Sequence, residues 1–154
     1  MEKVFEDYFS ELQGEIVAIC AEYADNKADG IYIYCSYEDK MYSFNVFYKM
    51  NGKVVHKHRL NETLEEGQRE RFDVSRERQR SMLKIGLGYL EEIHKKCQEF
   101  NRDMPTEIKI HYNAKENKLR ARYQYDPVWS DTKELAPPDI FISWFEEVKK
   151  ANQR

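Results

Sequence analysis

The feature that most constrains the fold of this chain is the pair Asn51-Gly52, which lies between two strand-like segments. Asn-Gly is the strongest two-residue signal for a β-hairpin, because both positions tolerate the positive φ angles that such a turn requires. Residues 41–49 before it alternate between two faces, as in a strand with one buried face. We therefore predict strands over residues 41–49 and 53–59, and the alternation upstream predicts an earlier strand over residues 31–37.

Helical spacing appears on both sides of this strand group. Apolar residues at intervals of three and four predict an amphipathic helix over residues 3–24. A second helix is predicted over residues 76–101, where Asp73 or Ser75 can cap its first turn.

Two glycines, Gly86 and Gly88, lie in the middle of the second helix and weaken it by about 1 kcal/mol each relative to alanine. We expect both to allow a close approach of this helix to the sheet. A second hairpin follows, with strands over residues 106–112 and 118–125, and Asp139 can cap a short final helix.

The predicted order of elements is α-β-β-β-α-β-β-α, without repeats or a linker. Short turns within each strand group favour antiparallel pairing. We therefore predict a single α+β domain over residues 1–154, with one antiparallel sheet of about five strands and the helices on one face.

Composition and cysteine usage indicate a cytoplasmic protein. The net charge of -3 is too small to select a partner by bulk electrostatics. The longest apolar run, Ile16 to Ala21, is too short to cross a bilayer, and the acidic N-terminus is unlike a signal peptide, so we expect no membrane partner. Cys20, Cys35 and Cys97 all fall within apolar patterns, which reduced core thiols explain better than disulfides.

Matching the alternation of the strands predicts two different sheet faces. The predicted core face comprises Ile31, Ile33, Cys35, Tyr42, Phe44, Val46, Ile108, Ile110, Tyr112, Leu119, Ala121, Tyr123 and Tyr125. The opposite face would be basic and aromatic, with Tyr32, Tyr34, Asn45, Phe47, Lys57, Arg59, Lys109, His111, Arg120, Arg122 and Gln124. The simplest explanation of this face is that a one-sided sheet shows polar residues to water.

No group of residues in the sequence has the pattern of a catalyst. The sequence has no nucleophile motif such as G-x-S-x-G, no Walker loop and no dinucleotide fingerprint. His56 and His58 lie two apart, but no further ligand at a matching spacing completes a zinc site. We therefore expect no enzymatic activity, no cofactor and no metal.

Several short segments resemble a known family. They are Phe72-Asp73-Val74-Ser75 before the long helix, Gln98-Glu99-Phe100 at its end, Pro105-Thr106-Glu107-Ile108, and Arg122-Tyr123-Gln124-Tyr125-Asp126. Together with the tyrosine-rich first hairpin, they make the chain similar to the YezG-like antitoxin (immunity) family of Gram-positive bacteria. The chain departs from that family in lacking a tryptophan before the first strand and another before the fourth.

The resemblance implies a cytoplasmic immunity protein that binds a cognate secreted toxin, often a nuclease, and blocks its active site. Nuclease clefts are basic because their substrate is polyanionic. The expected partner-binding residues are therefore acidic and aromatic and lie at the end of the last strand and in the loop after it: Tyr125, Asp126, Trp129, Asp131 and Glu134. Trp129 is the best anchor candidate, although a large aromatic side chain in such a loop can equally fold back onto the core.

Two other functions remain open from the sequence. Tyr32 and Tyr34, on the basic face with Phe47, could stack the bases of single-stranded nucleic acid. The sequence lacks the strand signature of the common RNA-binding modules, so nucleic acid ranks below a protein toxin as the partner. The same aromatic face could also form a homodimer.

Overall fold

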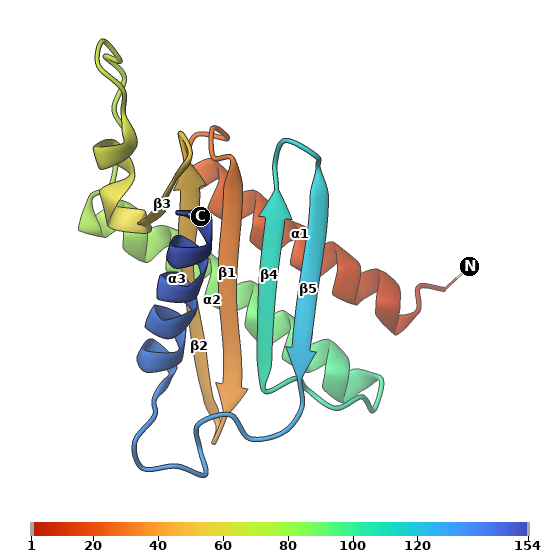
Figure 1. Ribbon diagram of the computed structural model, residues 1–154. Helices are drawn as coiled ribbons and strands as arrows, with labels where there is room; N and C mark the ends of the chain where they lie inside the picture. The colour runs from red at the N-terminus through yellow and green to blue at the C-terminus, as the bar shows by residue number, and fades with distance from the viewer. Residues whose placement is uncertain (1, 154) are drawn as a thin grey trace.

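The computed structural model describes residues 2–153 as three α-helices, one 3-10 helix and a five-stranded antiparallel sheet (Figure 1). The elements are α1 (Phe5–Tyr23), β1 (Gly30–Glu38), β2 (Met41–Met50), β3 (Lys53–His56), the 3-10 helix η1 (Lys57–Thr63), α2 (Arg76–Glu99), β4 (Glu107–Asn113), β5 (Lys118–Gln124) and α3 (Pro137–Asn152). The strands lie in the order β3-β2-β1-β4-β5. The α+β class and the predicted order of elements are confirmed.

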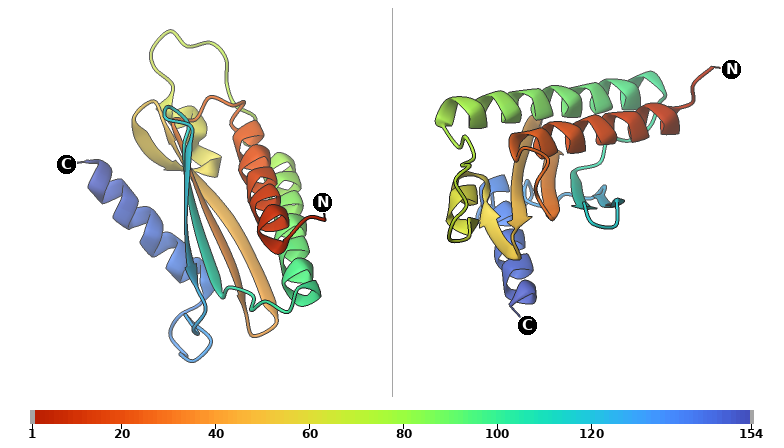
Figure 2. Two further views of the ribbon diagram at one scale, coloured as in Figure 1. Left: turned by 90° about the vertical axis from the view of Figure 1, so that its right-hand side faces the viewer. Right: turned by 90° about the horizontal axis from the view of Figure 1, so that it is seen from above.

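The helices cover both faces of the sheet, so their predicted placement on one face was wrong. Figure 2 shows α1 and α2 on one side of the sheet and α3 on the other. The reason is that the second face carries large apolar side chains of its own. Tyr34, Phe47 and Val54 form a second buried cluster with three residues of α3, namely Phe141, Trp144 and Phe145.

Two tight turns build the three-stranded half of the sheet. Asn51 and Gly52 have φ angles of 51° and 79°, and Asp39 and Lys40 have φ angles of 50° and 61°. Positive φ at both central positions is the geometry of a type I′ hairpin turn, whose twist matches that of the flanking strands. The Asn-Gly turn predicted from the sequence is therefore confirmed.

Strand β3 is shorter than predicted. It ends at His56, and the chain turns into η1, where Leu60 is fully buried in the core beneath α1 and α2. Burial of this leucine draws the chain away from the sheet edge, because an apolar side chain of its size gains about 1.5–3 kcal/mol from burial.

Helix α2 begins as the sequence indicated, at the Ser75 cap. The Ser75 hydroxyl accepts a hydrogen bond from the backbone N–H of Arg78 at 3.2 Å. Gly86 faces the Phe44 ring, and a Cβ atom there would lie 2.3 Å from two ring carbons. Gly88 faces open space, so the close approach expected there was wrong.

The predicted core face is correct, since Tyr123 of β5 contacts Phe9 of α1 on that face, but full burial is confined to the central strands. Ile31, Ile33, Cys35, Val46, Ile108 and Ile110 are buried beneath α1 and α2. Leu119, Tyr123 and Tyr125 are exposed, because β5 is the edge strand of the sheet and Tyr125 lies beyond its end. The three cysteines are free and buried, as expected.

Candidate functional site

Trp129, the predicted anchor for a partner, is buried and packs back onto the protein. Its indole N–H donates a hydrogen bond to the Ser36 hydroxyl on β1 at 3.2 Å. Of the two positions that the sequence left open for this side chain, the structure has the one that folds back onto the protein. The physical reason is that a sheet residue holds the backbone on both sides of this tryptophan.

That residue is Glu38, at the end of β1, which is 5% exposed. Its Oε1 atom accepts hydrogen bonds from the backbone N–H of Val128 at 2.8 Å, from the backbone N–H of Ser130 at 3.1 Å and from the Ser130 hydroxyl at 2.6 Å. The N–H of Trp129 lies 3.3 Å from the same oxygen. Burial opposes the charge of Glu38, but the Ser130 hydroxyl and these backbone donors outweigh it and lower the pKa of the carboxyl group. Glu38 thus fastens the segment after β5 to the tip of the first hairpin.

The other predicted partner-binding residues of this segment remain on the surface. Tyr125 is 55% exposed, and Asp126, Asp131 and Glu134 are exposed. Their carboxylates make no hydrogen bond or ion pair with other residues of the described chain, which runs from residue 2 to residue 153. The structure therefore leaves four of the five residues of this segment free to contact a partner.

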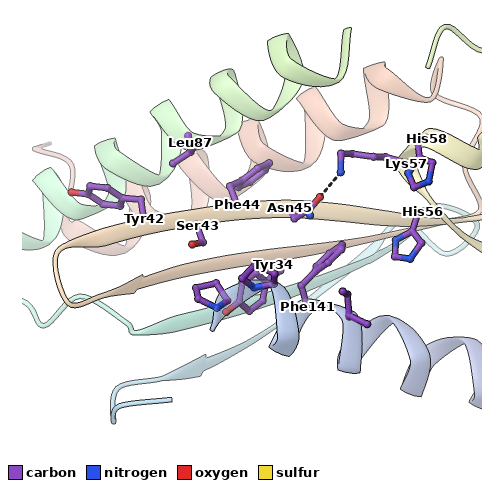
Figure 3. A pocket seen from close by; sticks show the side chains of 13 residues that line it. Tyr34, Tyr42, Ser43, Phe44, Asn45, His56, Lys57, His58, Leu87 and Phe141 are labelled. Atoms are coloured by element: carbon purple, nitrogen blue, oxygen red, sulfur yellow. Dashed lines mark hydrogen bonds between the residues drawn. The ribbon is translucent and has the colours of Figure 1, made fainter. Parts of the chain in front are cut away.

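An apolar groove of about 580 Å³ begins where this segment enters α3 (Figure 3). Strand β2 forms its floor, α2 contributes Leu87 to one wall, and α3 forms the other wall. The α3 wall consists of Pro137, Pro138, Phe141 and Ile142. Ile142 is 51% exposed, which is high for a large apolar residue and places apolar surface at the mouth of the groove.

One end of the groove is basic. Lys57 Nζ donates a hydrogen bond to Asn45 Oδ1 at 2.9 Å, and burial lowers the pKa of Lys57. His56 stacks on Phe145 with ring centroids 3.7 Å apart, and His58 lies beyond it, with 5.7 Å between the two imidazole centroids. Burial lowers the pKa of both histidines. No carboxylate lines the groove among the residues that the structure describes.

The two histidines do not complete a metal site within residues 2–153. No group of three or more histidine, cysteine, aspartate or glutamate residues there is arranged to hold a metal ion. A zinc site needs three or four such ligands.

Helix α3 covers most of the aromatic rings on the basic face that was predicted to bind nucleic acid. Tyr34 and Phe47 are buried, so the assignment of Tyr34 to an open face was wrong. Tyr32 is half-buried and lies between the Phe47 ring at 4.7 Å and the His111 ring at 4.3 Å. The basic residues of β4 and β5 remain beside it, but no free aromatic face is left at Tyr32 for a base.

The groove was not predicted from the sequence, because it exists only where β3 ends early and α3 packs on the sheet. Both features depend on contacts between residues far apart in the chain. A signal was present, however. Phe141, Trp144 and Phe145 form an apolar stripe on α3, and Phe47 lies on the sheet face that was expected to be open to solvent. Large apolar groups on two elements would have predicted their contact.

Comparison with known family models and curated proteins found no similar protein. No known family model matches the chain, and no curated protein matches it. Within residues 2–153, no helix combines the length and apolar character that a membrane span requires.

Proposed function

We propose that this protein is a binding module that neutralises a partner protein, in the manner of the immunity proteins that its sequence resembles. The partner in that case is a cognate toxin, and the protein acts by covering the toxin's active site. Catalysis by this chain has no part in the proposal.

The observation that carries the proposal is the apolar groove along β2. Its volume of about 580 Å³ and its mouth at the exposed Ile142 give a concave site with apolar walls and a basic end. Protein interfaces commonly centre on such a desolvated apolar region with polar groups at its rim.

The segment before α3 gives the proposed interface a second part. It leads directly into the wall of the groove and carries Tyr125, Asp126, Asp131 and Glu134 on the surface. Carboxylates there suit a partner with a basic cleft, as a nuclease has, because complementary charges speed association and select the partner.

Co-expression tests the proposal directly. Each candidate toxin domain encoded beside this chain is expressed alone and together with it, and growth is measured. We expect one such domain to arrest growth alone, growth to be restored by this chain, and the two proteins to elute as a one-to-one complex. Failure to restore growth against every neighbouring domain that arrests it would refute the proposal.

A matched pair of variants locates the contact. Replacement of Asp131 and Glu134 by lysine should weaken the complex and make its association slower, since both carboxylates are exposed and unpaired within residues 2–153. The same charge change at Glu65 and Glu66, which are exposed between η1 and α2 and lie outside the groove, should leave binding unchanged.

A further inference from the structure

Strand β3 pairs with only part of β2. Its four residues lie opposite Phe47 to Met50, whereas β2 starts at Met41. Residues 42–45 of β2 are paired with β1 on one side and line the groove on the other (Figure 3). The position beside them in the sheet, in line with β3, has no strand within residues 2–153.

The hairpin geometry fixes which backbone groups face this open side. Residues of an antiparallel strand direct their N–H and C=O groups alternately to the two neighbours. Glu38 and Met41 close the two-residue turn and are therefore a hydrogen-bonded pair, as are Ser36 with Ser43 and Tyr34 with Asn45. Tyr42 and Phe44 lie between these pairs, so their N–H and C=O groups point toward the groove.

A hydrogen bond on the far side of β1 supports this alternation. The N–H of Tyr37 donates to the carbonyl of Thr106 at 3.0 Å, so Tyr37 faces β4 while its neighbours Ser36 and Glu38 face β2. The backbone of Tyr42 and Phe44 makes no hydrogen bond to a loop, a helix or a side chain elsewhere in the described chain. Two donors and two acceptors are thus open at the edge of β2.

Asn45 marks where the open edge ends. The N–H of Val46, the next group to face outward, donates to the side-chain oxygen of Asn45 at 2.8 Å. Lys57 Nζ donates to the same oxygen at 2.9 Å. The N–H of Val46 is therefore satisfied within the chain, and among the described residues of β2 before Phe47 the backbone groups open to the groove are those of Tyr42 and Phe44.

We propose that the groove receives an extended segment of the partner protein as an added strand, antiparallel to β2 and in line with β3. This inference rests on the proposed function, since it names the part of the partner that binds. Main-chain hydrogen bonds to Tyr42 and Phe44 provide affinity, and alternate side chains of the segment enter the two walls of the groove.

The walls specify the side chains of this segment. A residue opposite Ser43 points toward α3, where it meets Phe141 and the buried hydroxyl of Tyr34, which has no hydrogen-bond partner among the described residues. Antiparallel pairing places the amino-terminal end of the segment near Asn45 and Lys57. The absence of lining carboxylates favours an acidic residue at that end.

A second copy of this chain fits the groove less well than a partner with an acidic strand. The strand that a second copy would offer at its own open edge is Met41-Tyr42-Ser43-Phe44-Asn45, which has no carboxylate to place beside Lys57.

Peptides test the strand addition without knowledge of the toxin. The probe is an acetylated six-residue peptide of glutamate followed by alternating valine and threonine, and the readout is amide hydrogen exchange by NMR. Saturating peptide should slow exchange at Tyr42 and Phe44 about tenfold, while the amide of Val46, already bonded to Asn45, should change little. Lysine in place of the glutamate should weaken binding about fivefold, because it faces Lys57.

Two controls make the result decisive. N-methylation of the peptide amides that face β2 should abolish binding, and Ile142→Glu should weaken it. Ile85→Glu should not, because Ile85 is similarly exposed, at 43%, but lies outside the groove. Unchanged exchange at Tyr42 and Phe44, equal binding of the N-methylated peptide, or protection of these amides by self-association of the free chain would overturn the strand addition.

The two proposals fail separately. If a neighbouring toxin is neutralised equally well by the protein and by the Ile142→Glu variant, the strand addition is wrong and the immunity function stands. If the peptide binds as described but no toxin is neutralised, the open edge is a binding site and the immunity function is wrong.

Discussion

Replacement of Glu38 by glutamine tests whether one carboxylate holds the segment between β5 and α3 against the sheet. Glutamine has nearly the same shape and can keep an oxygen at the position of Oε1. That oxygen would still accept from the N–H groups of Val128 and Ser130 and from the Ser130 hydroxyl. The substitution therefore removes the negative charge while leaving the geometry in place.

The expected loss follows from the kind of hydrogen bond. A hydrogen bond to a charged group contributes about 1.5–3 kcal/mol, against about 0.5–1.5 kcal/mol between neutral groups. Because four donors share one oxygen and their contributions are not additive, we expect Glu38→Gln to lower the free energy of unfolding by about 2 kcal/mol. Glu38→Ala removes the acceptor altogether and should lower it by about 4 kcal/mol, since the freed N–H groups lie in a partly buried site.

Urea unfolding at about pH 7, followed by far-UV circular dichroism, measures this difference. The pKa of Glu38 is lower in the folded protein than in the unfolded chain, so its stabilising effect is complete above the unfolded pKa. The effect is lost as the pH falls through the folded pKa. The gap between the wild-type protein and Glu38→Gln should therefore close on acidification.

Glu134→Gln is the matched control, because Glu134 is exposed in the same segment and its carboxylate makes no contact within residues 2–153. It should change the free energy of unfolding by less than about 0.5 kcal/mol. If Glu38→Gln behaves like this control at about pH 7, or if its effect persists unchanged in acid, the charge of Glu38 does not hold this segment.

Two further predictions concern packing and protonation. Gly86→Ala would place a Cβ atom 2.3 Å from the Phe44 ring and should destabilise the protein by about 2 kcal/mol in thermal or urea unfolding. Gly88→Ala, which meets open space in the same helix, should instead stabilise it by up to about 1 kcal/mol, and equal effects at both positions would contradict the packing argument. For His56, burial against Phe145 lowers the pKa below its ordinary 6.5, so NMR titration of the folded protein should give a value under that of the unfolded chain. The folded state then favours the neutral ring, so the free energy of unfolding should fall as the pH drops from the unfolded-state pKa to the folded-state pKa of His56. This fall should be smaller in His56→Gln, which has no imidazole to protonate at this position.

Most helices and strands of this fold could be predicted from local sequence patterns. The turn at Asn51 and Gly52 followed from the conformational freedom of two residues, and α2 begins at the Ser75 cap as its hydroxyl indicated. Such features depend on neighbours a few positions away, so the sequence alone could specify them. The same holds for the antiparallel pairing within each strand group, because short turns join strands that then pair next to each other. The pairing of β1 with β4 was not predicted, because these strands are separated by α2 in the chain.

The candidate site depended on contacts between distant segments. Alternation assigned Phe47 and Tyr34 to the second face correctly, but it could not tell that α3, about a hundred residues later in the chain, would cover them. Trp129 stood in a polar loop by sequence and was buried because Glu38 binds the backbone on either side of it. Neither the covering of Phe47 and Tyr34 by α3 nor the burial of Trp129 can be predicted from the residues within about ten positions of each side chain.

The order of elements, the Asn51-Gly52 turn and the Ser75 cap follow from the amino-acid sequence, because they depend on backbone freedom and on the period of apolar residues. The cap predicted at Asp139 was wrong, because α3 begins earlier, with Ala136 as its N-cap and Asp139 accepting a hydrogen bond from the Ala136 N–H. Long-range packing sets the end of β3 at His56, the position of α3 on the second face and the open strand edge in the groove between α2 and α3. These features arise when segments far apart compete to bury apolar surface, and only the folded chain settles that competition.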